Sequence, residues 1–421
     1  MERVILVGVF DKKKDPRLEA ASLEELRRLA ETAGAAIAGT LTQRLDRFHP
    51  GSLIGAGKVA EAAALARELG ARTVIFDQDL SPAQQIHLEG EIGAKIVDRT
   101  RLILDIFAQR ARTKEGELQV ELAQLSYMLP RLTGSWRAFS QQVGGIGTRG
   151  PGERKLEYER RHIQRRLEHL KRAIARIEGE RGIQRGRRQA VPVPATAIIG
   201  YTNAGKSTLL NRLIGSAEGK RVYADDKLFA TLDATTRRVR LPDWGEAVFT
   251  DTVGFISKLP TTLIAAFRST LEEVGQADCL IQLEDGASGD LPAQRRVVMD
   301  VLKELGALEL PRVTAVNKSD LLSADEKARL TEQDPDRLFV SAADGTGIDA
   351  LLGRVRHVLG HRWLIRELAL HPSQSGCLGE VYRCAHVIDR SSRRGRMVFR
   401  LRVTQENWAR LLNMLESKNC R

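Results

Sequence analysis

The chain has 421 residues, of which 42% are hydrophobic and 29% are charged, and its formal net charge is +12. This length exceeds what one hydrophobic core supports and predicts several domains, and the apolar content excludes a largely disordered chain. No uncharged apolar run approaches the roughly 20 residues that cross a bilayer, and residues 1–10 lack the features of an export signal. We therefore expect a cytoplasmic protein with no stable membrane insertion, whose four cysteines stay thiols and bind no zinc.

Residues 1–110 alternate short β-rich runs with amphipathic stretches of helix length. The strand-like runs are residues 4–9, 36–41, 73–76 and 95–97, and the helix-like stretches are residues 22–33, 58–69 and 83–91. Strands separated by helices predict an amino-terminal α/β domain with a small parallel sheet. Gly55-Ala-Gly57-Lys58 could suggest a second nucleotide site, but a loop that leads into a helix is the favoured interpretation.

Two segments follow in which leucine and isoleucine recur at spacings of three and four, Leu118–Leu132 and Leu156–Ile177. This spacing predicts an antiparallel coiled-coil hairpin over residues 111–181. The glycine-rich residues 133–153 are expected to form its flexible basic tip, and the turn-rich residues 182–194 a linker. Residues 153–188 hold 13 Lys or Arg against 6 Glu, which suits RNA but equally suits a solvated helix face. The tip residues that could contact RNA phosphates or bases are Trp136, Arg149, Arg154 and Lys155.

A glycine-rich loop begins at Gly200 and has the sequence Gly-Tyr-Thr-Asn-Ala-Gly-Lys-Ser. A strand-like run precedes it and a helix-like run follows it, which is the context of a phosphate-binding loop. In such a loop the backbone N–H groups surround the phosphates, Lys206 reaches the β and γ phosphates, and the Ser207 hydroxyl binds magnesium. The sequence therefore predicts a central Ras-like P-loop GTPase domain over residues 195–360.

Asp251-Thr-Val-Gly254 lies after the next strand-like run. Its carboxylate suits magnesium bound through water, and the Gly254 N–H suits the γ-phosphate. The following residue is Phe255, where Ras-like enzymes place a glutamine that orients the attacking water. Because a phenyl ring cannot make that hydrogen bond, we expect slow turnover by the free enzyme.

Asn317-Lys-Ser-Asp320 follows another apolar run and predicts selection of guanine. The Asp320 carboxylate can accept the N1 and N2 protons of guanine, which adenine does not offer in that arrangement. Asn317 and the stem of Lys318 would support the ring, and a backbone N–H of Ser341-Ala342 would touch the guanine oxygen. Because ligands in open α/β sheets bind at the carboxyl ends of strands, these segments are expected to converge.

The mobile switch lies between the loop and the second strand and holds Thr231, Thr235 and Thr236. Any of the three could place its hydroxyl on magnesium; Thr231 is favoured and Thr235 is the alternative. The residues expected to bind the nucleotide are Gly200, Tyr201, Thr202, Asn203, Ala204, Gly205, Lys206, Ser207, Thr208, Phe229, Ala230, Thr231, Leu232, Asp233, Asp251, Thr252, Val253, Gly254, Asn317, Lys318, Ser319, Asp320, Ser341 and Ala342. Those expected to act in hydrolysis are Lys206, Thr231, Gly254 and Asn203.

Residues 361–421 predict a small carboxy-terminal α+β domain. Apolar runs at residues 379–382 and 397–403 flank a turn-like segment at residues 389–395, and residues 406–415 look helical. Cys377 and Cys384 are interpreted as small core or surface residues rather than metal ligands.

Taken with Leu228-Phe-Ala-Thr-Leu-Asp and Gly147-Thr-Arg-Gly-Pro-Gly-Glu, these motifs resemble the HflX family of translational GTPases over essentially the whole chain. The resemblance supports Thr231 as the magnesium threonine. It implies GTP, GDP and magnesium as ligands, binding of the large ribosomal subunit and its RNA in the GTP state, and splitting or rescue of stalled ribosomes under stress. Ala234, where proline is common, and the slightly longer Gly215–Lys220 depart from the family pattern and could alter switch mobility.

Several further expectations remain open. Asn203 occupies the position of the asparagine in potassium-activated GTPases, which makes it a candidate ligand for K⁺. We expect a monomer without DNA specificity. One alternative is a GTP-dependent RNA-modification or ribosome-assembly factor; RNA modification would need a second catalytic constellation, which the sequence does not offer. Another is a membrane-remodelling GTPase, which would need an apolar insertion segment that the sequence also lacks.

Overall fold

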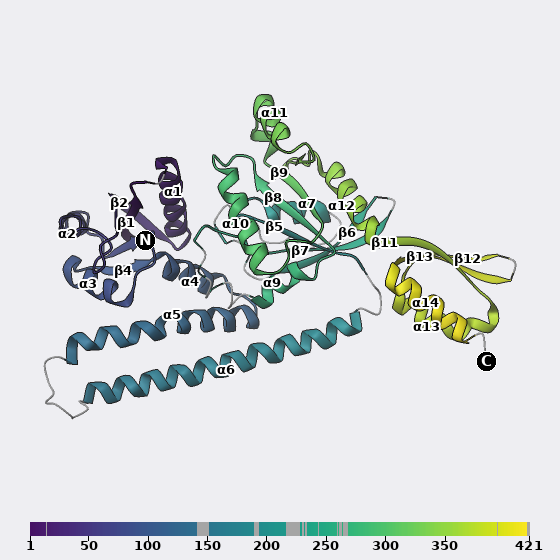
Figure 1. Cartoon of the computed structure of the whole chain (residues 1–421), viewed down its shortest axis with the longest axis horizontal. Coiled ribbons are helices and arrows are strands. Elements are labelled where there is room, and N and C mark those ends of the chain that lie inside the picture. Colours follow the sequence, from purple (N-terminus) through teal and green to yellow (C-terminus); the bar gives the residue numbers. More distant parts are fainter. Residues whose placement is uncertain are drawn as a thin grey trace. The chain divides into compact units, whose positions relative to one another are not determined.

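The computed structural model describes residues 1–13, 15–140, 151–188, 193–215, 228–229, 231, 234–242, 244–258, 260, 263, 268–393 and 395–418 (Figure 1). The chain divides into two compact units. The first comprises Met1–Ala175 together with Asp225–Leu232 and Ser257–Phe267, and the second comprises Arg176–Ala224, Asp233–Ile256 and Arg268–Arg421.

The amino-terminal domain is built on a parallel sheet with strand order β2-β1-β3-β4. Its strands and helices are β1 (Glu2–Asp11), α1 (Pro16–Thr32), β2 (Ala35–Leu45), α2 (Ala56–Glu68), β3 (Thr73–Phe76), α3 (Pro82–Ile92), β4 (Lys95–Asp98) and α4 (Arg99–Arg110). Local sequence sets several helix starts: Asp15 caps α1 before Pro16, and Ser81 and Gln84 form a capping box on α3. The predicted parallel α/β domain is confirmed, whereas helix α4 was not predicted.

Two long helices follow, α5 (Lys114–Ser140) and α6 (Pro151–Arg188). They run side by side in opposite directions, and the guanidinium of Arg166 joins them by donating to both carboxylate oxygens of Glu121 at 2.7 and 2.8 Å (Figure 1). In α5, Tyr127 and Arg131 both donate to the buried Asp98 carboxylate, which fastens this helix to the amino-terminal domain. The predicted heptad pattern therefore forms helices, as expected.

The boundaries of these helices differ from the prediction. Helix α5 continues through Pro130 to Ser140, and α6 begins at Pro151, so both ends of the expected tip 133–153 are helical. Isolated proline and glycine residues weaken a helix without ending it when its neighbours favour helix, and Pro151 stands at the first helical position, where its missing N–H costs nothing. The arginine-rich residues 182–188 of the expected linker are helical as well. Residues 141–150 and 189–192 lie outside the described residues.

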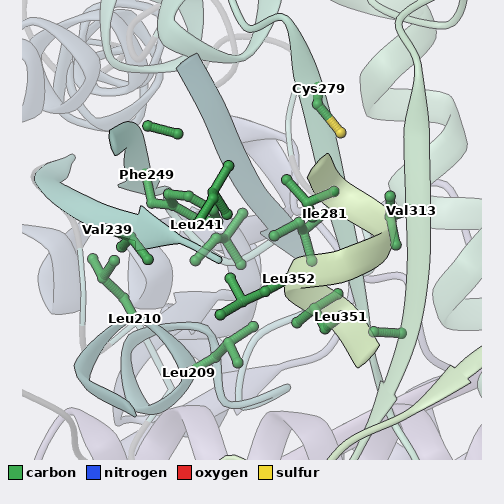
Figure 2. Close-up of a cluster of buried hydrophobic side chains, with 14 of the residues drawn as sticks. Leu209, Leu210, Val239, Leu241, Phe249, Cys279, Ile281, Val313, Leu351 and Leu352 are labelled. Carbon is green, nitrogen blue, oxygen red and sulfur yellow. The ribbon is translucent and has the colours of Figure 1, made fainter. Parts of the chain in front are cut away.

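The GTPase domain contains a six-stranded sheet with order β10-β9-β8-β5-β7-β6, in which only the β6–β7 pair is antiparallel. Its elements are β5 (Ala195–Gly200), α7 (Lys206–Ile214), β6 (Thr235–Leu241), β7 (Gly245–Asp251), α9 (Arg268–Gly275), β8 (Cys279–Asp285), α10 (Leu291–Glu304), β9 (Arg312–Asn317), η1 (Ser319–Leu321), α11 (Ala324–Gln333), β10 (Leu338–Phe339) and α12 (Ile348–Arg362). Figure 2 shows the core in which α7 and α12 pack on strands β6 to β9. The predicted P-loop α/β fold is confirmed.

The carboxy-terminal domain has an antiparallel sheet with order β11-β13-β12. Its elements are β11 (Trp363–Leu370), η2 (Pro372–Cys377), α13 (Leu378–Cys384), β12 (His386–Arg393), β13 (Arg396–Thr404) and α14 (Gln405–Lys418). The apolar run 379–382 is helical, and residues 389–393, expected to be a turn, belong to β12. The bend comes later, at Gly395, which has a φ of +76°.

The carboxy-terminal sheet joins the GTPase core without a loop, because β11 starts directly after α12. Trp363 is buried in the GTPase core cluster. From β13, the buried Arg402 stacks over the ring of Trp244 with its guanidinium carbon 4.3 Å from the ring centroid, and it donates to the Glu246 carbonyl at 2.9 Å. These contacts all lie within the second compact unit.

Within the described ranges, none of the helices is both long and apolar enough to cross a membrane. The same residues contain no group of three or more His, Cys, Asp or Glu side chains that could hold a metal ion. Cys279, Cys377 and Cys384 are buried thiols, whereas Cys420 lies outside the described residues.

Candidate nucleotide-binding site

The phosphate-binding loop connects buried strand β5 to α7. Two glycines determine its path. A Cβ atom on Gly200 would lie 2.2 Å from the carbonyl oxygen of Leu283, and one on Gly205, whose φ is +86°, would lie 2.2 Å from Nδ2 of Asn317. Asn203 also adopts a left-handed conformation, with a φ of 62°. Helix α7 then begins at Lys206, directly after the loop. The N-terminus of a helix carries partial positive charge, which favours a phosphate at this position.

Lys206 is buried beneath the loop. Its Nζ donates to the carbonyl oxygens of Gly200 and Tyr201 at 3.2 and 2.8 Å. Burial lowers the pKa of Lys206 to about 8, and the nearby Asp251 carboxylate opposes this shift only in part. The ammonium is thus held at the loop by weak acceptors, and the phosphates of a nucleotide would be stronger ones.

Ser207 and Asp251 provide adjacent oxygen groups. The Ser207 hydroxyl donates to Oδ2 of Asp251 at 2.7 Å, and Asp251 is fully buried at the end of β7. A hydroxyl and a carboxylate next to a phosphate-binding loop are the ligand types that Mg²⁺ takes, the carboxylate often through water. The side chains present therefore fit the predicted magnesium site.

The segment after Asp251 is fastened to the phosphate-binding loop by its backbone. The Thr202 N–H donates to the carbonyl of Phe255 at 2.8 Å, and the Phe255 N–H donates to the carbonyl of Gly200 at 3.1 Å. Gly254 lies against the loop so closely that a Cβ atom on it would meet Cα of Thr202 at 2.8 Å and Nζ of Lys206 at 3.0 Å. The structure thus brings Gly254 and Lys206 together, as the sequence predicts.

Asn317 connects two parts of the site. Its Nδ2 donates to the carbonyl of Ala204 at 2.8 Å, and its Oδ1 accepts from the N–H of Ala342 at 2.9 Å. Only 2% of this residue is exposed. Sequence reasoning predicted support for the guanine ring, and it missed this bridge between the phosphate-binding loop and residues 341–342.

Lys318 and Asp320 follow in a tight turn. Lys318 has a φ of 61°, and its Nζ lies 2.8 Å from Oδ2 of Asp285 at the end of β8. This ion pair holds the lysine stem in place. Asp320 stands in the short helix η1 and is exposed, so its carboxylate is accessible to a base.

The N–H groups of Ser341 and Ala342 are both engaged. Ser341 donates to the carbonyl of Thr346 at 2.9 Å, and Ala342 donates to Asn317. If either N–H is to touch a guanine oxygen as predicted, it must share its hydrogen bond or exchange its partner. Ser341 and Ala342 are otherwise buried at the end of the sheet next to Asn317.

Of the switch residues, Phe229 and Thr231 belong to the first compact unit, whereas Thr235 and Thr236 begin β6 in the second. Phe229 buries its ring against Phe107 of α4 in an edge-on contact, with the ring centroids 4.6 Å apart, and its contact with nucleotide stays a prediction. Thr231 is half-buried, and its place on magnesium stays a prediction. Ala230, Leu232 and Asp233 lie outside the described residues, as do the side chains of Trp136, Arg154 and Lys155.

Three family models match consecutive parts of the chain. Residues 20–108 match a model described as GTP-binding GTPase N-terminal, and residues 110–188 match one described as GTP-binding GTPase middle region. Residues 195–318 match a model described as 50S ribosome-binding GTPase.

Individual proteins match over most of the chain. A GTPase HflX from Caldanaerobacter subterraneus is 47% identical over 358 residues, which cover 85% of this chain and 81% of the relative. The GTPase HflX of Escherichia coli K12 is 40% identical over 415 residues, which cover 97% and 95%. Among solved structures, a GTP-binding protein from the archaeon Sulfolobus solfataricus in complex with GDP matches with a TM-score of 0.43 and 22% identity over 86% of this chain and 99% of that chain.

Proposed function

The chain belongs to the HflX family of GTPases, and on that premise we propose that it is a magnesium-dependent switch that acts on ribosomes. It binds guanine nucleotide and hydrolyses GTP to GDP and phosphate. In its GTP form it binds the large ribosomal subunit, and it dissociates or rescues stalled ribosomes under stress. The observation that carries the ribosomal part is the match of residues 195–318 to the 50S ribosome-binding GTPase model.

Exposed cations on α6 support an RNA partner. On α6, Arg160, Arg165 and Lys171 are exposed. Exposed cations can replace the counterions of RNA phosphates, which makes binding depend on salt. Neighbouring arginines such as Arg161 and Arg172 are paired with glutamates of the same helix, so they contribute less net charge.

The site geometry supports hydrolysis by positioning and charge neutralisation. Lys206 would hold the β and γ phosphates, Gly254 would donate its N–H to the γ-phosphate, and Asp320 would select guanine. Magnesium would be held by Ser207 and Thr231, and by Asp251 through water. When bound, it would neutralise charge on the β and γ phosphates.

The free enzyme would turn over slowly. Phe255 is 1% exposed and has no group that can orient a water molecule, so the attacking water lacks the side chain that Ras-like enzymes supply. The ribosome would supply or stabilise the missing geometry. Asn203 would hold a potassium ion near the charge that develops in the transition state.

Co-sedimentation with purified ribosomal subunits tests the ribosomal part. We expect binding to the large subunit with a non-hydrolysable GTP analogue, much weaker binding with GDP, and subunit release when intact ribosomes are added. Substitution of Arg160, Arg165 and Lys171 by alanine should weaken binding and flatten its salt dependence, whereas alanine at the exposed Arg329 and the half-buried Lys327 of α11 should not. Equal binding with both nucleotides, or none, contradicts the proposal. Binding only to immature particles, without subunit release, would favour the assembly factor.

A further inference from the structure

A cluster of charged side chains in the first compact unit holds the segment that follows Gly254. Ser257 and Lys258 belong to this unit together with the amino-terminal domain. Nζ of Lys258 donates to the Ser22 hydroxyl at 2.9 Å and pairs with Oδ2 of Asp77. The Ser22 hydroxyl donates to the same Asp77 oxygen at 2.7 Å.

Arg99 completes this cluster from the start of α4. Its Nη1 donates to Oδ1 of Asp77 at 2.7 Å, and its Nη2 pairs with Glu25 and donates to the Ser257 hydroxyl at 3.2 Å. The Ser257 hydroxyl in turn donates to Glu25. We call Ser22, Glu25, Asp77, Arg99, Ser257 and Lys258 the switch anchor.

The switch anchor is electrically balanced, and its centre is buried, whereas the side chain of Lys258 is 44% exposed at its edge. It contains two carboxylates and two cations, and Asp77 and Arg99 are 0% and 1% exposed. If Lys258 left, the buried Asp77 would lose one of its two cationic partners, and uncompensated buried charge is unfavourable. Lys258 also has a φ of 55°, a conformation that a lysine keeps only where its surroundings hold it.

The segment that precedes Thr231 also contacts the amino-terminal domain. The Leu228 N–H donates to Oγ1 of Thr32 at 3.3 Å, and the ring of Phe229 packs on Phe107. Both residues are nearly fully buried, at 4% and 2% exposed. Leu228 and Phe229 precede Thr231 by three and two positions. The amino-terminal domain therefore restrains the chain close to Thr231 as well as close to Gly254.

Gly254 precedes Ser257 by only three residues and lies against Thr202 and Lys206 of the phosphate-binding loop. We propose that Lys258 and Asp77 are positioning residues for GTP hydrolysis, because their ion pair restrains the segment that presents the Gly254 N–H to the γ-phosphate. This rests on the proposed role of Gly254. GDP has no γ-phosphate, so the restraint contributes to GTP binding and turnover and not to GDP binding.

The test compares three lysine variants of the full-length chain. Lys258→Met removes the charge but keeps the length, and Lys258→Arg keeps the charge. Lys12→Met is the control, since Lys12 forms an exposed ion pair with Asp46 in the same domain at 2.9 Å. For each variant, kcat and KM for GTP, the Kd values for GDP and for a non-hydrolysable GTP analogue, and thermal unfolding are measured.

For Lys258→Met we expect kcat to fall and the Kd of the GTP analogue to rise by about fivefold or more, the lower range of coupling between sites, with the Kd of GDP unchanged. Lys258→Arg should keep kcat and the Kd of the GTP analogue close to the values of the parent protein. Lys12→Met should change neither value. The proposal is overturned if Lys258→Met leaves kcat and the ratio of analogue to GDP affinity unchanged. It is equally overturned if GDP affinity is lost in parallel, because the role is then structural only.

A separate variant distinguishes this proposal from the role of Gly254 itself. Gly254→Ala places a methyl group 2.8 Å from Cα of Thr202, and it should abolish turnover and the preference for the analogue if Gly254 meets the γ-phosphate. If Gly254→Ala leaves both intact, the site assignment fails. If Gly254→Ala abolishes both but Lys258→Met changes neither, only the switch anchor loses its role.

Discussion

The side-chain nitrogen of Asn317 donates to the backbone carbonyl of Ala204 at 2.8 Å, so one buried amide joins the guanine-binding segment to the phosphate-binding loop. The same amide accepts from the Ala342 N–H through its oxygen. A side chain that uses both its donor and its acceptor on buried backbone cannot be shortened without leaving both partners unpaired. A change at Asn317 is therefore expected to disturb both the guanine-binding segment and the phosphate-binding loop.

Asn317→Ala should weaken binding of GDP and of a GTP analogue alike. Each buried backbone group left without a partner costs about 1–3 kcal/mol of unfolding free energy, so the melting temperature should fall. The affinity should fall as well, because the phosphate-binding loop and Ala342 lose the amide that holds them in place. Nucleotide titration and thermal unfolding measure both effects. Asn413→Ala on the exposed face of α14 is the matched control and should change neither; an equal loss there would refute the assignment.

Asp320→Asn should alter base selection while leaving the fold intact, because Asp320 is exposed. A carboxylate accepts two protons from guanine, whereas an amide offers one donor and one acceptor and suits xanthine better. Since hydrogen bonds to charged groups contribute about 1.5–3 kcal/mol, GTP affinity should fall about tenfold to a hundredfold and xanthosine triphosphate affinity should rise. Asp325→Asn, an exposed carboxylate on α11, serves as the control. Unchanged preference for GTP would show that Asp320 does not read the base.

Nucleotide affinity should fall as pH rises above about 8. The pKa of Lys206 is about 8 because the group is buried, and bound phosphates would raise it, so binding favours the protonated form. Affinity is then full below the pKa of the free protein and falls by up to about tenfold per pH unit above it. Calorimetry in buffers of different ionisation enthalpy should detect proton uptake above pH 8. Lys206→Met should bind nucleotide more weakly and should take up no proton on binding above pH 8. If the variant still takes up a proton, the proton belongs to another group.

GTP turnover should be several-fold faster in potassium chloride than in sodium chloride at equal ionic strength. The proposed cation ligand is the Asn203 side chain, and its backbone φ of 62° is one that glycine adopts as readily. Asn203→Gly therefore removes the amide and keeps the loop conformation, and it should abolish the difference between the two salts. Equal rates in the parent protein would remove potassium from the mechanism.

Gly205→Ala should destabilise the protein more than Gly306→Ala. Both glycines have a positive φ, of 86° and 66°, but a Cβ on Gly205 would lie 2.2 Å from Nδ2 of Asn317, whereas nothing lies within 4 Å of one on Gly306. The control should lose about 1–2 kcal/mol of unfolding free energy from backbone strain alone, and Gly205→Ala should lose that and a steric cost. Chemical denaturation compares the two. Equal losses would mean that Asn317 moves aside freely.

Sequence was most informative where function depends on local chemistry. The phosphate-binding loop, Asp251, Gly254 and Asn317 lie at strand ends as predicted, because a strand, a glycine-rich turn and a helix leave a recognisable local pattern. The parallel amino-terminal sheet was predicted for the same reason. The ends of α5 and α6 were not, because single proline and glycine residues inside a long helix look like stop signals when only local sequence is read.

Long-range contacts outside the nucleotide motifs could not be predicted from one sequence. Lys258 and Asp77 are separated by 181 positions, and nothing near either residue indicates the other. The burial of Phe229 on Phe107 was missed likewise. A buried charge such as Arg402 is also invisible in sequence, because arginine is usually a surface residue.

The loop-free junction between α12 and β11 limits how the carboxy-terminal domain can be studied. Ending the chain at Arg362 would remove Trp363 from the GTPase core and expose the face of Trp244 that Arg402 covers. Such a truncated protein would lose stability for reasons unrelated to any partner of the missing domain. Point substitutions on the outer surface of β12, which leave this seam closed, are the cleaner way to learn what the domain recognises.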